Sequence, residues 1–181
     1  MAICSSLNSI LKTNSCEGNN VGGIYTVYIA DQLDVSGYTT DINSSASGYT
    51  ITGMTMIGSV KHNTFQFNRN LGNFKVETTV DLLAGSTYHK ATLTLKFLRR
   101  EASKSRAIQI LGEGQRYLSV IIKDAVGTYT YMDFAQVSGG GEDTGTKKED
   151  GNSYDVVITS DMISKPLFIN EATVTSVVTV L

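Results

Sequence analysis

The clearest pattern along the chain lies between His89 and Gly112, where strict alternation gives way to a helical period. Hydrophobic residues at every second position alternate with polar ones: Ala91, Leu93, Leu95 and Phe97 against Lys90, Thr92, Thr94 and Lys96. This alternation predicts a strand with one face in the core and the other in water.

The period changes after this strand. Residues 102–111 place Ala102, Ser105, Ile108 and Leu111 on one helical face, and Gly112 supplies a common C-terminal stop. We therefore expect one α-helix over about residues 102–111.

The other segments with a β pattern are distributed over the whole chain. We expect strands at residues 24–30, 49–57, 64–70, 74–83, 117–123, 128–134, 154–159 and 173–181. Residues 64–70, 74–83 and 89–97 follow one another closely and have polar residues on alternate positions. The sequence therefore predicts that these three strands form a meander with one polar face, and that residues 173–181 add a last strand to the sheet.

Three polar segments interrupt these strands. Residues 1–23 are expected to form an N-terminal arm, residues 31–48 a loop, and residues 138–152 a flexible loop, because the last segment is rich in Gly and charge and has no apolar residues to bury. A length of 181 residues without a repeat predicts a single domain spanning 1–181.

Composition narrows the class of protein. Thr, Val, Ile, Tyr and Gly are frequent, Pro occurs once and Trp is absent, which is typical of a mainly β protein. The net charge of −2 does not favour a protein that grips nucleic acid. Cys4 and Cys16 are expected to be reduced thiols, and the sequence predicts neither a signal peptide nor a membrane span.

Candidate chemistry is sparse. His62 and His89 each lack a second ligand at metal-binding spacing, and there is no Gly-x-Ser-x-Gly nucleophile motif. Gly112-Glu113-Gly114 and Gly139-Gly140-Gly141 lack the residues that complete a phosphate loop. The sequence therefore predicts no enzyme, no catalytic residue, no metal and no cofactor.

The order of segments, however, resembles a known family. The matching features are Gly22-Gly23-Ile24 with Val27-Tyr28-Ile29-Ala30, then Phe65-Gln66-Phe67, the alternating strand and helix ending at Leu111-Gly112, Val120 to Asp124 with Gly127, Thr144-Gly145, and Asp150 to Tyr154. In this order and spacing, roughly residues 21–160 resemble the major tail tube proteins of long-tailed bacteriophages, particularly those infecting Bacteroidetes.

The resemblance implies a β-sandwich with a flanking helix. Six copies would form a ring, the inner sheets would join into one ring-wide β-barrel, and stacked rings would form the channel for DNA ejection. Polar residues of the meander would face that lumen: Gln66, Asn68, Lys75, Glu77, Thr92, Thr94 and Lys96. Charged residues of the two internal loops are candidates for contacts between rings: Asp31, Asp34, Asp41, Glu142, Asp143, Lys147 and Lys148.

In this interpretation the protein is a structural part of the virion tail, assembled in the host bacterial cytoplasm without a membrane anchor. Its partners would be further copies of itself, other tail proteins such as the tape measure, baseplate or terminator, and DNA in transient, non-specific passage.

Two alternatives stay open from the sequence. The first is another ring or tube component, such as the inner tube of an injection system, a tail terminator or a connector, because a fold does not specify a role. The second is a monomeric β-sandwich that binds a small molecule or a glycan through some of the nine tyrosines.

Overall fold

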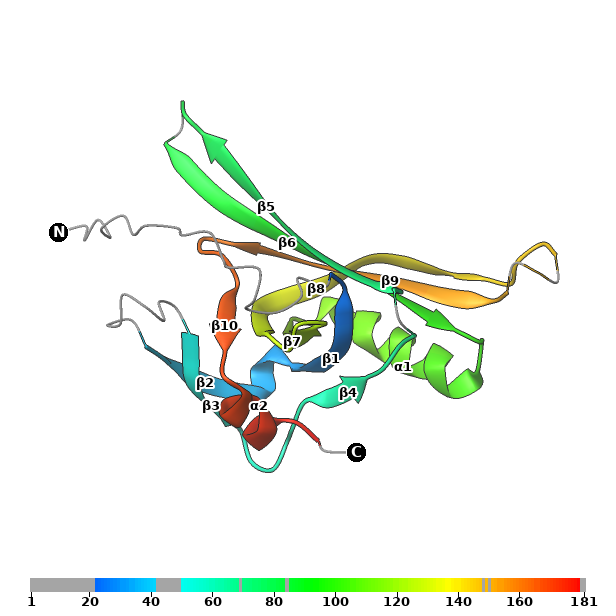
Figure 1. Cartoon of the computed structure of the whole chain (residues 1–181), viewed down its shortest axis with the longest axis horizontal. Helices are drawn as coiled ribbons and strands as arrows, with labels where there is room; N and C mark the ends of the chain where they lie inside the picture. Colours follow the sequence, from blue (N-terminus) through cyan, green and yellow to red (C-terminus); the bar gives the residue numbers. More distant parts are fainter. Residues whose placement is uncertain are drawn as a thin grey trace, which may run out of the picture.

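A computed structural model describes residues 22–41, 50–68, 70–83, 85–147, 149 and 151–179. These residues form a mainly β structure with a curled sheet and two α-helices (Figure 1). The predicted N-terminal arm, residues 1–23, lies almost entirely outside the described residues, which begin at Gly22.

Seven strands form one part of the sheet, in the spatial order β2-β3-β10-β8-β7-β1-β4. Their bounds are β1 (Ile24–Asp31), β2 (Val35–Asp41), β3 (Thr50–Met56), β4 (Asn63–Phe65), β7 (Leu118–Asp124), β8 (Tyr129–Asp143) and β10 (Leu167–Ile169). A short 3-10 helix, η1 (Gln32–Asp34), links β1 to β2.

The other part of the sheet has the order β5-β6-β9-β8 and is antiparallel throughout. It contains β5 (Gly72–Asp81), β6 (Ser86–Leu98) and β9 (Ser153–Met162). The strand β8 belongs to both parts, because its first half pairs with β7 and β10 and its second half pairs with β9. We call the β5-β6-β9-β8 part the outer layer.

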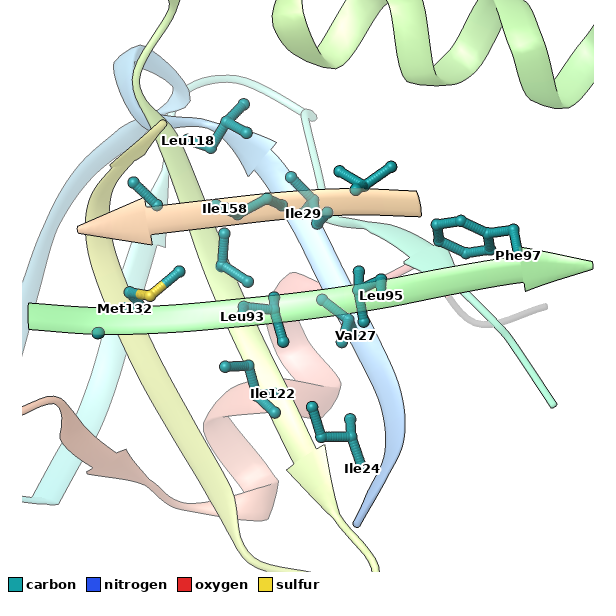
Figure 2. Close-up of a cluster of buried hydrophobic side chains, with 14 of the residues drawn as sticks. Ile24, Val27, Ile29, Leu93, Leu95, Phe97, Leu118, Ile122, Met132 and Ile158 are labelled. Carbon is teal, nitrogen blue, oxygen red and sulfur yellow. The ribbon is translucent and has the colours of Figure 1, made fainter. Parts of the chain in front are cut away.

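The main core lies where the outer layer packs on the first part of the sheet (Figure 2). The alternation predicted for residues 90–97 is confirmed, since Ala91, Leu93, Leu95 and Phe97 of β6 are all buried there. They meet buried side chains from β1, β7 and β8, including Val27, Val120 and Met132. Each such side chain stabilises the fold by about 1.5–3 kcal/mol relative to an exposed one.

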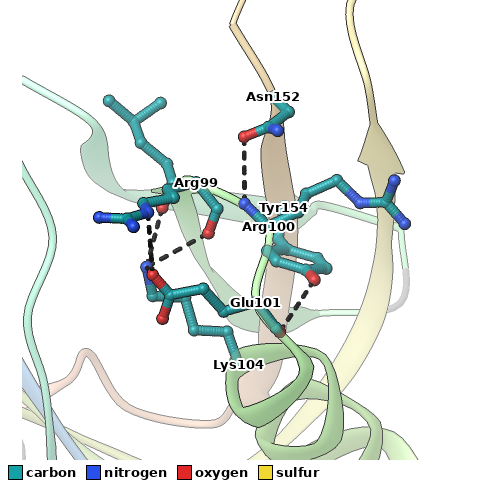
Figure 3. A network of polar contacts seen from close by, with 7 residues as sticks. Arg99, Arg100, Glu101, Lys104, Asn152 and Tyr154 are labelled. Carbon is teal, nitrogen blue, oxygen red and sulfur yellow. Dashed lines mark hydrogen bonds and ion pairs between the residues drawn. The ribbon is translucent and has the colours of Figure 1, made fainter.

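The predicted helix is confirmed as α1 (Ala102–Gly112), which continues into a 3-10 turn, η2 (Glu113–Gln115). Ile108 and Leu111 pack against the main core. Its N-terminus is joined to the outer layer by polar contacts (Figure 3): the Tyr154 hydroxyl donates to the Glu101 carbonyl at 3.2 Å, and Lys104 Nζ donates to the Leu98 carbonyl at 3.0 Å.

A second core lies on the far side of the seven-stranded part, and it corrects one prediction. Residues 173–181 were expected to be a strand, but residues 171–177 form the helix α2 (Glu171–Val177). Asn170 caps this helix by accepting from Thr173 N at 2.8 Å, and Val174 and Val177 pack on β3, β7 and β8. The Asn170 cap and the burial of Val174 and Val177, which lie on one helical face, outweigh the strand propensity of Thr and Val in this segment.

Two predicted loops are also wrong in part. Within 31–48, the described residues form the end of β1, then η1 and β2, and residues 42–49 lie outside the described part. Within 138–152, residues 138–143 continue β8, because every one of those from Gly139 to Asp143 is paired with β9. Backbone hydrogen bonding between strands does not require apolar side chains, so the polar, glycine-rich composition of residues 138–143 did not predict this strand.

The predicted meander is wrong in its first strand. Of the predicted residues 64–70, only Thr64 and Phe65 lie in β4, and β4 pairs with β1 rather than with β5. On the side away from β5, β6 pairs with β9 over ten residue pairs.

Candidate assembly surface

The most prominent surface feature is a hairpin formed by β5 and β6. Ten consecutive residue pairs join the two strands, from Gly72↔Leu95 to Asp81↔Ser86. Figure 1 shows that the hairpin extends well beyond the rest of the molecule. Its described residues from Glu77 to Tyr88 are all exposed, so the distal half of the hairpin contributes no residue to the core.

One face of the outer layer is mainly polar, and its apolar members are Tyr88, Leu98 and Val157. Lys75 lies opposite Thr92, and Thr92 lies opposite Thr159 of β9, so these side chains share a face. Glu77, Thr94 and Lys96 follow at alternate positions on the same face. Five of the seven predicted lumen residues are thus brought together, whereas Gln66 and Asn68 lie in the segment after β4 and outside this layer.

The charges of this polar face are paired. Lys75 Nζ lies 2.6 Å from Glu77 Oε1, and Lys96 Nζ lies 3.8 Å from Asp155 Oδ1. Lys90 lies between Glu77 and Asp161 in the strand register. Side-chain hydrogen bonding and charge from Lys75 lower the pKa of Glu77, so this carboxylate is ionised at neutral pH. The face is therefore hydrophilic without a strong excess of either sign.

The outer layer has an open edge on each side. Among the described strands, β5 pairs only with β6, and β8 beyond Val137 pairs only with β9. The Lys96 N–H donates to the Leu71 carbonyl at 2.8 Å, which fixes the alternation of the β5–β6 ladder. By that alternation, the backbone groups of Phe74, Val76, Thr78 and Val80 point away from β6, toward the open edge.

The glycines of β8 lie at the second open edge. A Cβ at Gly140 would lie 2.3 Å from the Asp155 carbonyl oxygen, so the chain itself requires glycine there. A Cβ at Gly141 would meet nothing within 4 Å. Glycine inside a strand often marks a close approach of another backbone, and no described residue of this chain makes that approach at Gly141.

The structure does not bring the predicted inter-ring residues together in one place. Asp31 accepts from Leu33 N at 3.0 Å and lies 3.6 Å from Arg116, near the start of β7. Glu142 binds Arg100 and Ser105 of the α1 region, and Asp143 accepts from Gly145 N at 2.8 Å. Asp34 ends η1, Asp41 ends β2, and Lys147 follows the β8 end. Lys148 lies outside the described residues.

The two histidines differ, and the sequence did not reveal how. His89 is half-buried at the base of the hairpin, where its Nδ1 lies 2.9 Å from Thr78 Oγ1. His62 is fully buried, with Nδ1 3.2 Å from the Val177 carbonyl and Nε2 2.8 Å from Ser119 Oγ. The sequence around His62 did not predict this burial, because Ser119 and Val177, which contact its ring, are distant in sequence.

In the part of the chain that the structure describes, no three His, Cys, Asp or Glu side chains gather closely enough to hold a metal ion, and neither helix has the length and hydrophobicity needed to cross a bilayer. A recess of about 620 Å³ lies beneath the base of the hairpin, lined by Phe74, Val76, Pro166 and Phe168 among others.

The chain matches no protein-family model, and no curated protein is significantly similar to it.

Proposed function

We propose that the chain is a structural subunit of a bacteriophage tail tube, which assembles through its outer layer into stacked hexameric rings. The observation that carries this proposal is the β5–β6 hairpin, which projects from the body with a mainly polar face, an open edge and a distal half whose described residues are all exposed. A long strand edge without a hydrogen-bonding partner makes a monomer prone to aggregate, whereas in an oligomer a strand of the neighbouring copy can pair with it.

Strand directions support closure into a ring. The four strands of the outer layer alternate in direction, so β5 and the end of β8 run in opposite directions. Rotation about a ring axis preserves the direction of each strand relative to that axis. The β8 edge of one copy therefore meets the β5 edge of the next as an antiparallel pair, and the layers join into one continuous barrel.

The two faces of the layer suit opposite sides of a tube wall. The apolar face packs on β1, β7 and β8, which corresponds to the two sheets of a sandwich. The polar face would line the lumen, and its paired charges would give DNA few lasting cationic contacts during ejection. In this proposal the protein is part of the virion tail, assembles in the host bacterial cytoplasm, contacts other tail proteins at the tube ends and has no catalytic role.

The test is the assembly state of the purified full-length protein. Analytical ultracentrifugation over a concentration series and negative-stain microscopy are expected to show rings or tubes with a central channel. Rings that do not stack would favour a terminator or connector. A particle that stays monomeric at the highest concentration, with a melting temperature that rises on adding a ligand, would contradict the proposal and favour a binding module that uses the recess beneath the hairpin.

A further inference from the structure

The tip of the hairpin carries strongly exposed apolar side chains. Leu82 is 89% exposed and Leu83 is 102% exposed, and Val80 beside them is 55% exposed. Together these adjacent side chains form an exposed apolar group at the end of a projecting element, which favours an interaction surface. We call Leu82 and Leu83 the hairpin tip.

A second exposed apolar group lies on the opposite side of the outer layer. Phe134 and Tyr117 are both more than half exposed and pack edge-to-face, with ring centroids 5.8 Å apart. Ile163, 92% exposed, lines the same small surface pocket as Phe134. We call Tyr117, Phe134 and Ile163 the Phe134 patch.

The backbone at Phe134 is strained. Its φ is +46°, a region that residues other than glycine rarely adopt, and it lies where β8 passes from β7 to β9. Gln32 helps to hold this bend, since its Oε1 accepts from Phe134 N at 3.2 Å. The bend directs a large apolar ring into solvent, and residues held in such conformations often belong to contact sites.

The Phe134 patch continues from the open edge of β8. Leu118 pairs with Ala135, so Tyr117 lies next to the point where the open edge begins. Gln136 Nε2 donates to the Gln115 carbonyl at 2.8 Å, which places the residues before β7 along the same edge. A strand added to this edge would therefore reach the patch if it were long enough.

The β5 strand has that length. The open part of β8, residues 138–143, is shorter than the ten residues of β5. In an antiparallel joint the end of β5 therefore extends past the open part of β8, toward Tyr117 at the start of β7, and the hairpin tip follows directly after that end.

We infer that the hairpin tip of each copy docks on the Phe134 patch of the next copy. This inference rests on the proposed ring assembly and names the apolar contact that secures it. The contact is heterologous, because tip and patch are different surfaces, and such contacts propagate around a ring.

The first test replaces Leu82 with Asp and Phe134 with Lys in the full-length protein. Each single variant is expected to raise the concentration needed for assembly by about tenfold or more, since it places a charge in an apolar contact. The double variant Leu82→Asp/Phe134→Lys is expected to recover assembly, because the two charges then attract. Val126→Asp is the matched control, because Val126 is as exposed as Phe134, at 58%, and lies in the β7–β8 turn.

The second test introduces no charge and measures disulfide formation between neighbouring copies. In a Cys4→Ser/Cys16→Ser background, Leu82→Cys with Phe134→Cys is expected to give a ladder of disulfide-linked oligomers, whereas either cysteine alone gives at most dimers. If the unaltered protein assembles but the charge variants assemble equally well and no ladder forms, the docking inference is wrong and ring assembly stands. If the unaltered protein stays monomeric at all concentrations, both are wrong.

Discussion

At the scale of single residues, His62 shows how a buried polar group is satisfied in this fold. The Val177 carbonyl can only accept a hydrogen bond, so Nδ1 carries the proton and Nε2 accepts from the Ser119 hydroxyl. Ser119 Oγ lies 3.4 Å from the Tyr131 hydroxyl, so the chain of contacts continues into the second core. His62 thereby links the segment before β4 to the end of α2.

This burial makes stability depend on pH. Desolvation lowers the pKa of His62 below its ordinary value of 6.5, against smaller opposing effects of the Val177 carbonyl and Asp34. Below about pH 6.5 the unfolded chain binds a proton that the native state resists, so stability falls with decreasing pH. The denaturant midpoint of the unaltered protein is expected to fall between pH 7 and pH 5 more steeply than that of His62→Gln.

The His62→Gln variant also loses one buried hydrogen bond, so we expect it to be less stable by about 1–3 kcal/mol at pH 7. Other titrating groups contribute equally to both proteins and cancel in the difference. Parallel midpoint curves for the two proteins between pH 7 and pH 5 would show that His62 does not cause the dependence.

Two adjacent glycines of β8 provide a matched pair. Gly140→Ala is expected to lower the free energy of unfolding by about 1–3 kcal/mol, because the new Cβ would lie 2.3 Å from the Asp155 carbonyl oxygen at a φ of +150°. Gly141→Ala is expected to change it by no more than about 0.5 kcal/mol, since nothing lies within 4 Å. Urea unfolding of both variants checks this, and equal losses would contradict the close approach at Gly140.

At the scale of elements, α2 depends on one capping residue and on its buried face. Its seven residues are too few for a stable isolated helix, so the helix persists because Val174 and Val177 pack in the second core and Asn170 satisfies Thr173 N. Thr173 adds a further anchor by donating from Oγ1 to the Thr52 carbonyl of β3 at 2.8 Å.

Removal of this cap should therefore be measurable. Asn170→Ala is expected to destabilise the protein by about 1 kcal/mol, whereas Asn170→Asp keeps an oxygen acceptor and should stay close to the unaltered protein. Thermal unfolding gives the comparison. A loss of the same size in both variants would mean that the amide nitrogen of Asn170, rather than its oxygen, stabilises the helix end.

At the scale of the whole molecule, the asymmetry of the outer layer matters most. One side ends in a long strand with its hairpin, and the other ends in the glycine-rich end of β8. The two edges are different and run in opposite directions, which favours head-to-tail joining of identical copies over two-fold pairing of like edges.

An edge variant separates backbone pairing from side-chain contact in this assembly. Val80→Pro removes an N–H that points toward the open edge, so the β5–β6 ladder should survive while lateral pairing is lost. Val80→Ala keeps the N–H and shortens only the side chain, and is the control. Sedimentation is expected to show a folded, unassembled Val80→Pro protein and an assembling Val80→Ala protein; if both assemble alike, the β5 edge is not the joint.

The sequence by itself determined the features that depend on neighbours along the chain. The alternation of Lys90 to Phe97 specified both faces of β6, and the spacing of Ala102 to Leu111 with Gly112 specified α1, because strand and helix periods place nearby residues on shared faces. Five of the polar residues expected on one surface were correctly grouped for the same reason.

Only the tertiary structure decided which strands pair and which segments gain support from distant partners. β4 pairs with β1 instead of taking the place beside β5 that sequence order would give to residues 64–70, and the Thr- and Val-rich end becomes a helix because a distant core covers it. Gly139 to Asp143 extends because β9 pairs with its backbone, and His62 is buried by residues far along the chain. Such contacts join positions whose separation in sequence carries no periodic signal, so local patterns do not encode them.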